Sequence, residues 1–466
     1  MKKSSFRKSD GFLYAVRVFL GSRWFPPLVM LAFFLGHTLA IELPVAALLI
    51  AVTVLGAFVS EDLRFLVPIL TGGVCILSRK NTPYLPFESD YFFTGWRLPA
   101  LILLASLLLL GIFVFILRKR RDAAPFSSLR LKWGFLGFFA ALLFSGLFQE
   151  NGGKNLLFGL GMGASFLLMY LLFGFFHPKT KENAEHFLYT LLCVGLLVSA
   201  ELFSLYFRSI VQFDGWIPVK GTILIGWGTW THIGAMLAMC LPAPFYFARE
   251  AKRSYPLWLL AGALMTAALL FSGSRASWLY GGMILCAAYL LLMLGGKNRR
   301  VSRILLIVPI LVGGVALILL FPNITAFLQG FVGFGGGDNG RFEIWAAALR
   351  AFRAAPIFGR GFLNTEIDLG FPVITPYLYH NTLLQMLGSA GVFGLLLYLF
   401  HRFETVRLLF RRCHSPLSLY LLLVPTALLL TSLTDEHIFH FYPAFFYVIA
   451  LSFAEGRYDE PPLIQK

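Results

Sequence analysis

Charged side chains are scarce in this 466-residue sequence: they make up 13% of it, whereas 58% of it is hydrophobic. Apolar blocks of roughly 17 to 25 residues recur along the chain, and each is long enough to cross the hydrocarbon core of a bilayer. No stretch is both polar and long enough to fold as a separate soluble domain. The composition therefore excludes an ordinary soluble protein and predicts one integral membrane domain.

Cysteine is also rare, and the chain has no CxxC pair, which argues against a zinc ribbon and against a disulfide framework. Five cysteines lie singly in or beside apolar segments, at Cys75, Cys193, Cys240, Cys286 and Cys413. Phosphate loops, HExxH and GxSxG signatures, and the paired carboxylates of metal-dependent sugar-nucleotide enzymes are missing as well. These absences favour a mechanism without metal or cofactor, in which the donor is already activated.

Acidic residues are outnumbered, since 23 Asp and Glu face 39 Lys and Arg and give a net charge of +16. The basic residues stand in short clusters between apolar blocks, as expected for the cytoplasmic loops of a membrane protein. Such clusters also favour anionic lipid headgroups. We therefore expect membrane lipids as partners and no nucleic acid.

The apolar blocks predict an all-α integral membrane protein of about 12 to 14 transmembrane helices. The candidate spans are 25–42, 44–59, 64–78, 98–117, 131–149, 155–176, 187–207, 229–248, 255–272, 276–295, 303–321, 382–400, 416–433 and 438–454. The span at 64–78 is short enough to be re-entrant. The first 23 residues show no cleavage pattern, so we expect a retained first span and no cleaved signal peptide.

The expected organisation has five parts. These are a cytoplasmic N-terminal segment at 1–24, a helix bundle over 25–321, a large outer loop over 322–381, C-terminal transmembrane helices over 382–454, and a cytoplasmic tail at 455–466.

Orientation follows from the basic clusters near 118–132, 179–181, 249–253, 297–303 and 402–412. An even number of spans separates each cluster from the next, so all of them and both termini can face the cytoplasm. The connections near 208–228, 273–275, 322–381 and 434–437 then face outward. The connection at 79–97 is an exception, because it is placed outside although it carries Arg79, Lys80 and Arg97.

The long outer loop contains a predicted amphipathic helix from Arg341 to Ala355. A glycine run at 333–337 precedes it, and Asp338 and Asn339 have the chemistry of helix N-caps. One face of the helix is apolar and typical of a helix lying at the membrane interface. That face carries Phe342, Trp345, Leu349 and Phe352, and Pro356 ends the helix.

His380 is the leading catalytic candidate, because it is followed by Asn381 at the predicted water boundary of a span. A near-neutral imidazole can take a proton from a sugar hydroxyl as that hydroxyl attacks. The alternative is an interfacial histidine bonded to a backbone carbonyl. Asp435, at the outer end of the penultimate span, has two interpretations: it orients His380 or an arginine, or it is an ordinary turn residue.

Four arginines on the outer side are candidates for binding a diphosphate. Arg275 lies between two apolar spans, where a charge is costly unless it is paired or faces a cavity. Arg341 adds a cation to the free amide donors at a helix start, and anions favour that combination. Arg360 and Arg208 are weaker candidates of the same type. For each, the alternative is a headgroup contact or a solvated charge.

Two further aromatic residues and a histidine, Trp227, Trp230 and His232, flank another outer span start. We interpret the tryptophans as belt residues.

The chain resembles the O-antigen ligase and O-antigen polymerase superfamily of bacterial membrane glycosyltransferases over roughly 270–400. The features that carry the resemblance are Arg275 with Leu279, the run Gly340 to Trp345, Pro356 with Gly359 and Gly361, and His380-Asn381 with Gly391 and Gly394. The first 200 residues carry no motif that aligns.

The resemblance implies a GT-C-like fold and an inverting, metal-independent transfer of a glycan from a polyprenyl diphosphate carrier to an acceptor hydroxyl. His380 would match the general base of the family, and Arg275 and Arg341 its diphosphate-binding arginines. The acceptor is a glycan, a lipid or a protein, and no residue separates ligases from polymerases.

Two other classes remain as alternatives. A transporter or flippase of lipid-linked sugars should show inverted repeats and polar residues at depth. The sequence has no convincing internal repeat, and its polar candidates gather at one face. A membrane scaffold is the other alternative, and the arginine-bearing outer loop counts against it.

Overall fold

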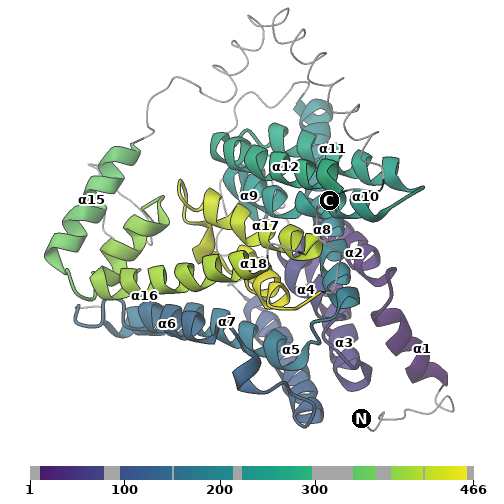
Figure 1. The fold of residues 1–466 in the computed structure, drawn as a ribbon, viewed down its shortest axis with the longest axis horizontal. Helices are drawn as coiled ribbons and strands as arrows, with labels where there is room; N and C mark the ends of the chain where they lie inside the picture. The colour runs from purple at the N-terminus through teal and green to yellow at the C-terminus, as the bar shows by residue number, and fades with distance from the viewer. Residues whose placement is uncertain are drawn as a thin grey trace, which may run out of the picture.

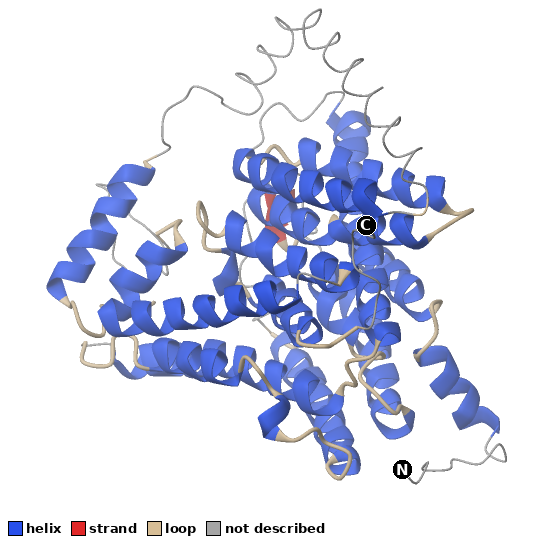
Figure 2. Ribbon diagram, in the orientation of Figure 1, coloured by secondary structure: helices blue, strands red, loops and turns tan. Residues whose placement is uncertain are grey.

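The chain folds almost entirely into α-helices, and the prediction of an all-α integral membrane protein is confirmed (Figure 2). The computed structural model describes residues 11–77, 95–149, 152–213, 223–295, 297, 340–363, 379–412 and 415–458. Its longer helices are α1 (Gly11–Leu20), α2 (Phe25–Leu39), α3 (Glu42–Val59), α5 (Arg97–Lys119), α6 (Lys132–Leu143), α7 (Gly152–Phe176), α8 (Lys181–Phe213), α9 (Trp230–Cys240), α10 (Pro242–Glu250), α11 (Tyr255–Phe271), α12 (Arg275–Gly295), α15 (Arg341–Ala354), α16 (Thr382–Arg412), α17 (Pro416–Thr431) and α18 (Phe441–Ala454).

Shorter elements complete the described part. They are α4 (Val67–Gly72), the 3₁₀ helices η1 (Gly73–Ile76), η2 (Phe126–Ser128) and η4 (His437–Phe439), and an antiparallel hairpin of β1 (Leu224–Ile225) and β2 (Gly228–Thr229). In this hairpin Leu224 pairs with Thr229 and Ile225 with Gly228. The hairpin ends at the start of α9, so it fixes where that helix begins.

The outer surface of the bundle is apolar, as a bilayer requires. The most apolar 18-residue stretch of helix α5 has a mean hydropathy of 3.1, yet only 11% of it is buried inside the protein. Leu103, Leu109 and Leu110 on this helix are each more than half exposed. Continuous apolar surface of this kind marks contact with a membrane or a partner. Lipid is the environment that fits a multi-pass chain of this composition.

Seven of the described helices are long and apolar enough to span a membrane, or eight if the pair α1 and α2, bent by 77°, forms one broken span. Five shorter apolar helices accompany them. Each predicted span within the described residues overlaps a helix or a helix pair, whereas 303–321 lies outside them. The pair α4 and η1 covers roughly 15 Å at 1.5 Å per residue, too short for a straight crossing. Helix α1 was not anticipated within the predicted segment 1–24.

Helix α16 lies along α6, which in turn packs on α7 (Figure 1). Glycines bring these helices close: a Cβ at Gly159 of α7 would stand 2.1 Å from the carbonyl oxygen of Leu142 in α6, and one at Gly134 would stand 2.9 Å from the His401 ring of α16. Small residues allow such close backbone approach in membranes. The tight contact between α6 and α16 fixes the position of α16 in the bundle.

Helix α16 is broken at Gly391, where φ is 64° and ψ is −163°. The segment 356–361 lies in the break and restores the lost backbone hydrogen bonds. The four bonds, 2.8 to 3.1 Å long, run from Arg360 N to Gly388 O, Gly361 N to Ser389 O, Val392 N to Pro356 O, and Phe393 N to Ile357 O. An unsatisfied backbone group in a bilayer costs several kcal/mol. The inserted segment therefore makes the break tolerable.

Glycine is required at this junction. Gly391 and Gly361 have positive φ values of 64° and 87°, which disfavour any residue with a Cβ. A Cβ at Gly391 would also lie 2.3 Å from the carbonyl oxygen of Ile357, and one at Gly361 would lie 2.3 Å from the Asn155 side chain. The glycines of the resemblance motif thus join the outer-loop segment to α16.

The predicted amphipathic helix is present as α15, which packs against α16 beside its break (Figure 1). Its packed face consists of Ile344, Ala347, Ala348 and Ala351. The predicted apolar face is divided: Phe342 is 68% exposed and Leu349 43%, whereas Trp345 packs against the buried cluster around Ile344. The expected N-caps Asp338 and Asn339 lie outside the described residues. Within the described residues, Gly340 directly precedes the helix with a φ of 74°.

The end of α18 is tied to the start of α6 by a buried carboxylate. Glu455 accepts hydrogen bonds from the backbone N–H groups of Arg130 and Leu131, from the Tyr170 hydroxyl at 2.6 Å and from Lys179 at 2.5 Å. The predicted tail 455–466 therefore begins with a buried, fully engaged residue. The ion pair between Glu455 and Lys179 lies in a region where other basic residues also gather.

We expect Gly391→Ala to lower the free energy of unfolding by about 2 kcal/mol or more, because the new methyl group would clash with Ile357 and hold a disfavoured φ. Thermal unfolding of the detergent-solubilised protein measures the change. Gly161→Ala on α7 is the matched control, since nothing lies within 4 Å of its new Cβ. Equal melting temperatures for the two variants would contradict this account of the break.

Candidate functional site

A polar pocket of about 630 Å³ lies where the first turns of several helices meet. We call it the polar pocket and define it by its lining residues: Thr229, Trp230, Thr231, His232, Ser274, Arg275, Ala276, Arg341, Phe342, Trp345, His380, Asp435, Glu436 and His440. They come from the starts of α9, α12 and α15 and from the residues just before α16 and α18. Unsatisfied N–H groups and the helix dipole make helix starts favourable for anions. The pocket is thus suited to a negatively charged group.

His380 is held in an unusual backbone conformation at the edge of this pocket. Its φ of 50° is in the left-handed region, which is uncommon for residues other than glycine. The neighbouring Asn381 accepts hydrogen bonds from the N–H groups of Leu383 and Leu384, both at 3.0 Å, and so caps α16. Its amide also donates to the carbonyl of Leu433 at 2.8 Å. Asn381 therefore fixes His380 relative to the turn that carries Asp435.

A second link joins the same two segments. Thr382 donates to the carbonyl of Ser432 from both its N–H group, at 3.1 Å, and its hydroxyl, at 2.8 Å. On the other side of His380, the N–H of Tyr379 donates to the Gln385 side chain at 2.7 Å. Contacts on both sides of the histidine stabilise the strained φ, and such strain gathers at functional sites.

The imidazole of His380 faces two carboxylates through one nitrogen. Nδ1 lies 2.9 Å from Oδ1 of Asp435, to which it donates, and 3.1 Å from Oε2 of Glu436. The Asp435 contact is a hydrogen bond, and the Glu436 carboxylate acts on the ring both through its charge and as a second, less well aligned acceptor. The His380 side chain is 30% exposed, whereas those of Asp435 and Glu436 are 10% and 8% exposed. Asp435 thus orients the ring, and Nε2 is the nitrogen on the side away from this contact.

Burial opposes a positive charge on His380, but hydrogen bonding and Coulomb attraction from Asp435 and Glu436 outweigh it and raise its pKa to about 11. For Glu436, burial and the nearby Asp435 charge raise the pKa to about 8. Burial also opposes the charge on Asp435, but His437 and His380 hold its pKa below the ordinary value. At neutral pH the ring is therefore cationic, paired with an ionised Asp435 beside a protonated Glu436.

Arg275 is the first residue of α12 and lines the polar pocket. The preceding Ser274 accepts from the N–H of Ser277 at 3.3 Å and so caps the helix. The cap sets the direction of the first turn of α12, at which Arg275 lines the pocket. A planar guanidinium can bind two phosphate oxygens at once.

Arg341 is the first residue of α15 and also lines the polar pocket. Phe342 and Trp345 of the same helix also line the pocket, and their rings contact each other edge to face at 5.5 Å between centroids. The structure thus brings Arg275, Arg341, His380 and Asp435 into one cavity, although their roles are still predictions.

Arg208 and Arg360 lie outside the residues that line this pocket. Arg208 is near the end of α8, where its Nε donates to the carbonyl of Ser204 at 3.4 Å. Arg360 has an exposed side chain in the segment inserted into the α16 break, and its N–H donates to the carbonyl of Gly388. The arrangement of the described residues gives neither arginine a part in the polar pocket.

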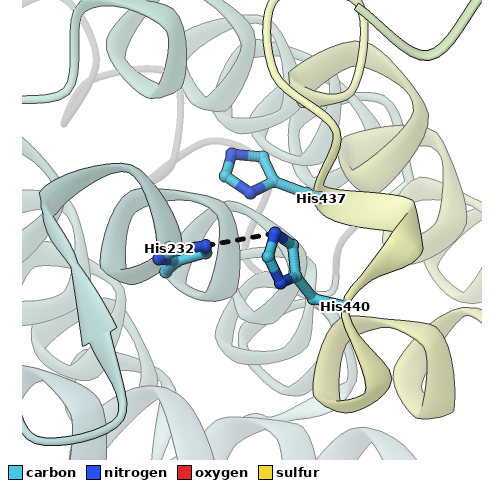
Figure 3. A group of neighbouring side chains, drawn as sticks. All are labelled: His232, His437 and His440. Atoms are coloured by element: carbon cyan, nitrogen blue, oxygen red, sulfur yellow. Dashed lines mark hydrogen bonds between the residues drawn. The ribbon is translucent and has the colours of Figure 1, made fainter. Parts of the chain in front are cut away.

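Sequence reasoning gave no functional role to four residues of this region: Glu436, His437 and His440, and His232, which it noted only beside a span start. The three histidines form a cluster in which the rings converge from α9 and from the residues around η4 (Figure 3). Glu436 and His437 follow Asp435 directly, so their spacing carried a signal. His232 lies about two hundred residues away, and only the fold brings it to the others.

We expect Glu436→Gln to lower the pKa of His380, because Glu436 is ionised where His380 titrates and its charge lies 3.1 Å from Nδ1. Histidine ¹⁵N NMR across neutral and alkaline pH measures this pKa, and His380→Gln identifies the signal. Glu404→Gln is the control, since Glu404 pairs with Arg407 on α16 and does not line the polar pocket. An unchanged His380 titration in Glu436→Gln would contradict the assigned electrostatics.

Residues 260–399 match the family model described as O-antigen ligase. The matched region contains α12, α15 and the first half of α16, and therefore Arg275, Arg341 and His380. It ends before Asp435, Glu436 and the histidines of η4. No curated protein matches the chain.

Proposed function

We propose that the chain is an O-antigen ligase-like glycosyltransferase of the O-antigen ligase and polymerase superfamily, and the family match over residues 260–399 supports this proposal. It moves a glycan from a polyprenyl diphosphate carrier to an acceptor hydroxyl, with inversion at the anomeric carbon. The observation that supports this proposal most directly is the polar pocket, which combines His380 and Asp435 with Arg275 and Arg341. A lipid-linked glycan as partner also agrees with the multi-pass membrane fold.

In the proposed reaction the acceptor oxygen attacks the anomeric carbon while Nε2 of His380 takes the hydroxyl proton. The bond between that carbon and the diphosphate oxygen breaks, and the diphosphate leaves with the electron pair. Asp435 keeps the imidazole oriented and stabilises the imidazolium that forms. Because His380 is cationic in the described pocket, it must first lose a proton. The reactive form therefore gains population as the pH rises.

Arg275 and Arg341 stabilise the departing diphosphate. Two guanidinium groups and several helix starts supply positive potential where negative charge develops, which lowers the barrier of the transfer. Arginine does here what a divalent cation does in other phosphate chemistry, so the proposed transfer step is metal-independent.

The orientation in the membrane is part of the proposal. Helix α12 begins in the polar pocket and ends shortly before Lys297, while α16 begins just after His380 and ends with Arg411 and Arg412. The ends of these helices that lie away from the pocket are thus basic, and basic ends favour the cytoplasm. This supports a pocket on the external or periplasmic face and both termini in the cytoplasm.

We expect His380→Gln to lower the rate of glycan transfer by about 10²- to 10⁴-fold, the usual contribution of a general base. The assay incubates purified protein in lipid nanodiscs with a polyprenyl diphosphate-linked glycan and an acceptor, and follows the glycosylated product and the released carrier. Leu383→Ala, an exposed neighbour on α16, should keep its rate and shows that a nearby change is harmless. Wild-type rates in His380→Gln would remove this residue from the mechanism.

The same assay separates the remaining alternatives by product. A ligase forms one new linkage on a distinct acceptor, and a polymerase lengthens the glycan on its carrier. A flippase forms no product at all and only moves the donor between leaflets.

Arg275→Ala and Arg341→Ala should each slow transfer, and the double variant should lose less than the product of the two single effects. The reason is that residues serving one diphosphate do not act independently. Rates with saturating and limiting donor measure the effects. Arg353→Ala, on the exposed last turn of α15, is the matched control. Strictly multiplicative losses would argue against a shared diphosphate site.

A further inference from the structure

Three histidines beside the polar pocket converge on one point without a part in the proposed transfer. The ligand atoms of His232, His437 and His440 all lie within 4.8 Å of one another. Figure 3 shows His232 and His440 joined through ring nitrogens, with a nitrogen of His437 facing the pair. Such a cluster needs an explanation, because imidazole is the commonest protein ligand for transition metals.

The distance between two of these rings fits a metal site. The Nε2 atoms of His232 and His440 are 3.3 Å apart. Two nitrogens bound to a tetrahedral Zn²⁺ at 2.0–2.1 Å stand about 3.3–3.4 Å from each other. The third nitrogen would have to move inward by roughly 1 to 1.5 Å to complete this geometry.

His437 gives the second, independent observation. Its side chain is 2% exposed, and its buried Nδ1 has no hydrogen-bond partner among the residues that the structure describes. A buried polar atom without a partner costs about 1–3 kcal/mol, and a metal ion would remove that cost. The other ring nitrogen, Nε2, lies 3.7 Å from Oδ2 of Asp435. Histidine ligands commonly direct their second nitrogen toward a carboxylate.

His232 can present its Nε2 as a ligand once its proton moves to the other ring nitrogen. In the described arrangement Nδ1 accepts a hydrogen bond from the N–H of Thr229 at 3.2 Å and lies 3.0 Å from the hydroxyl of the same residue. When Nε2 binds a metal, Nδ1 carries the proton and donates it to the Thr229 hydroxyl, and the N–H of Thr229 loses this acceptor. The hydrogen bond between His232 and His440 then gives way to two metal–nitrogen bonds.

We propose that His232, His437 and His440 bind one divalent transition-metal ion of the Zn²⁺ class. Three neutral imidazoles suit such ions, whereas Mg²⁺ and Ca²⁺ prefer oxygen ligands. Arg341 and the cationic His380 oppose a nearby cation, and the Asp435 carboxylate offsets them. This balance also favours an ion that forms strong nitrogen bonds. His232 and His440 line the polar pocket, so the proposed site adjoins it.

The ion positions residues and does not enter the proposed transfer step. Through His437 it would fix Asp435, which in turn orients His380. The inference does not depend on the proposed function, because it concerns binding of a metal alone.

The test measures metal binding by tag-free protein in nanodiscs. The protein is stripped with a chelator, reloaded with Zn²⁺, separated from free metal, and assayed for metal by mass spectrometry. We expect one bound equivalent in the wild type and a loss of most of it in His437→Gln and His440→Gln. His380→Gln and His401→Gln are matched controls outside the cluster and should keep the equivalent. Size-exclusion elution shows which variants are folded.

X-ray absorption at the zinc edge of the wild type decides the matter even if a cluster variant fails to fold. Imidazole nitrogens at about 2.0–2.1 Å are the expected scatterers. A wild type that retains no stoichiometric metal, a spectrum without imidazole, or full metal content in folded His437→Gln and His440→Gln would each overturn the proposal.

Discussion

Backbone hydrogen bonding inside the bilayer is the constraint on which the arrangement of this protein depends. A helix of 31 residues that breaks at Gly391 exposes amide and carbonyl groups, and lipid offers them no partners. The segment 356–361 supplies those partners from the chain that follows α15. One set of four hydrogen bonds therefore fixes α15, which carries Arg341, relative to the helix that begins just after His380. The polar pocket depends on this junction.

A second constraint concerns charge. His380, Asp435 and Glu436 share little water, and each group changes the protonation of the others. The chain places this cluster on a turn that Asn381 and Thr382 hold by hydrogen bonds to Leu433 and Ser432. Precise positions matter here, since the electrostatic energy of a buried pair changes steeply with distance. The rigidity of the turn and the protonation of the site are therefore linked.

Much of the architecture followed from hydropathy, because a bilayer imposes length and composition on every span. The sequence also predicted that Arg275, Arg341, His380 and Asp435 lie on one side of the membrane domain, because the positions of lysine and arginine assign each connection between spans to a side. The pocket brings these four residues together. The features that the sequence did not predict have physical reasons as well. A glycine at position 391 indicates a special backbone position, but the sequence does not predict that residues 356–361 fill the break. His232 joined His437 and His440 only through tertiary packing, which no local pattern encodes.

The position of Phe342 has a consequence for how reactants arrive. This side chain lines the polar pocket and is at the same time mostly exposed on α15. One aromatic side chain of the cavity wall thus also belongs to the exposed surface of α15. A substrate with a hydrocarbon anchor can approach by lateral diffusion within one leaflet, with its headgroup turned into the cavity. Its supply is then governed by surface density in the membrane and not by concentration in water.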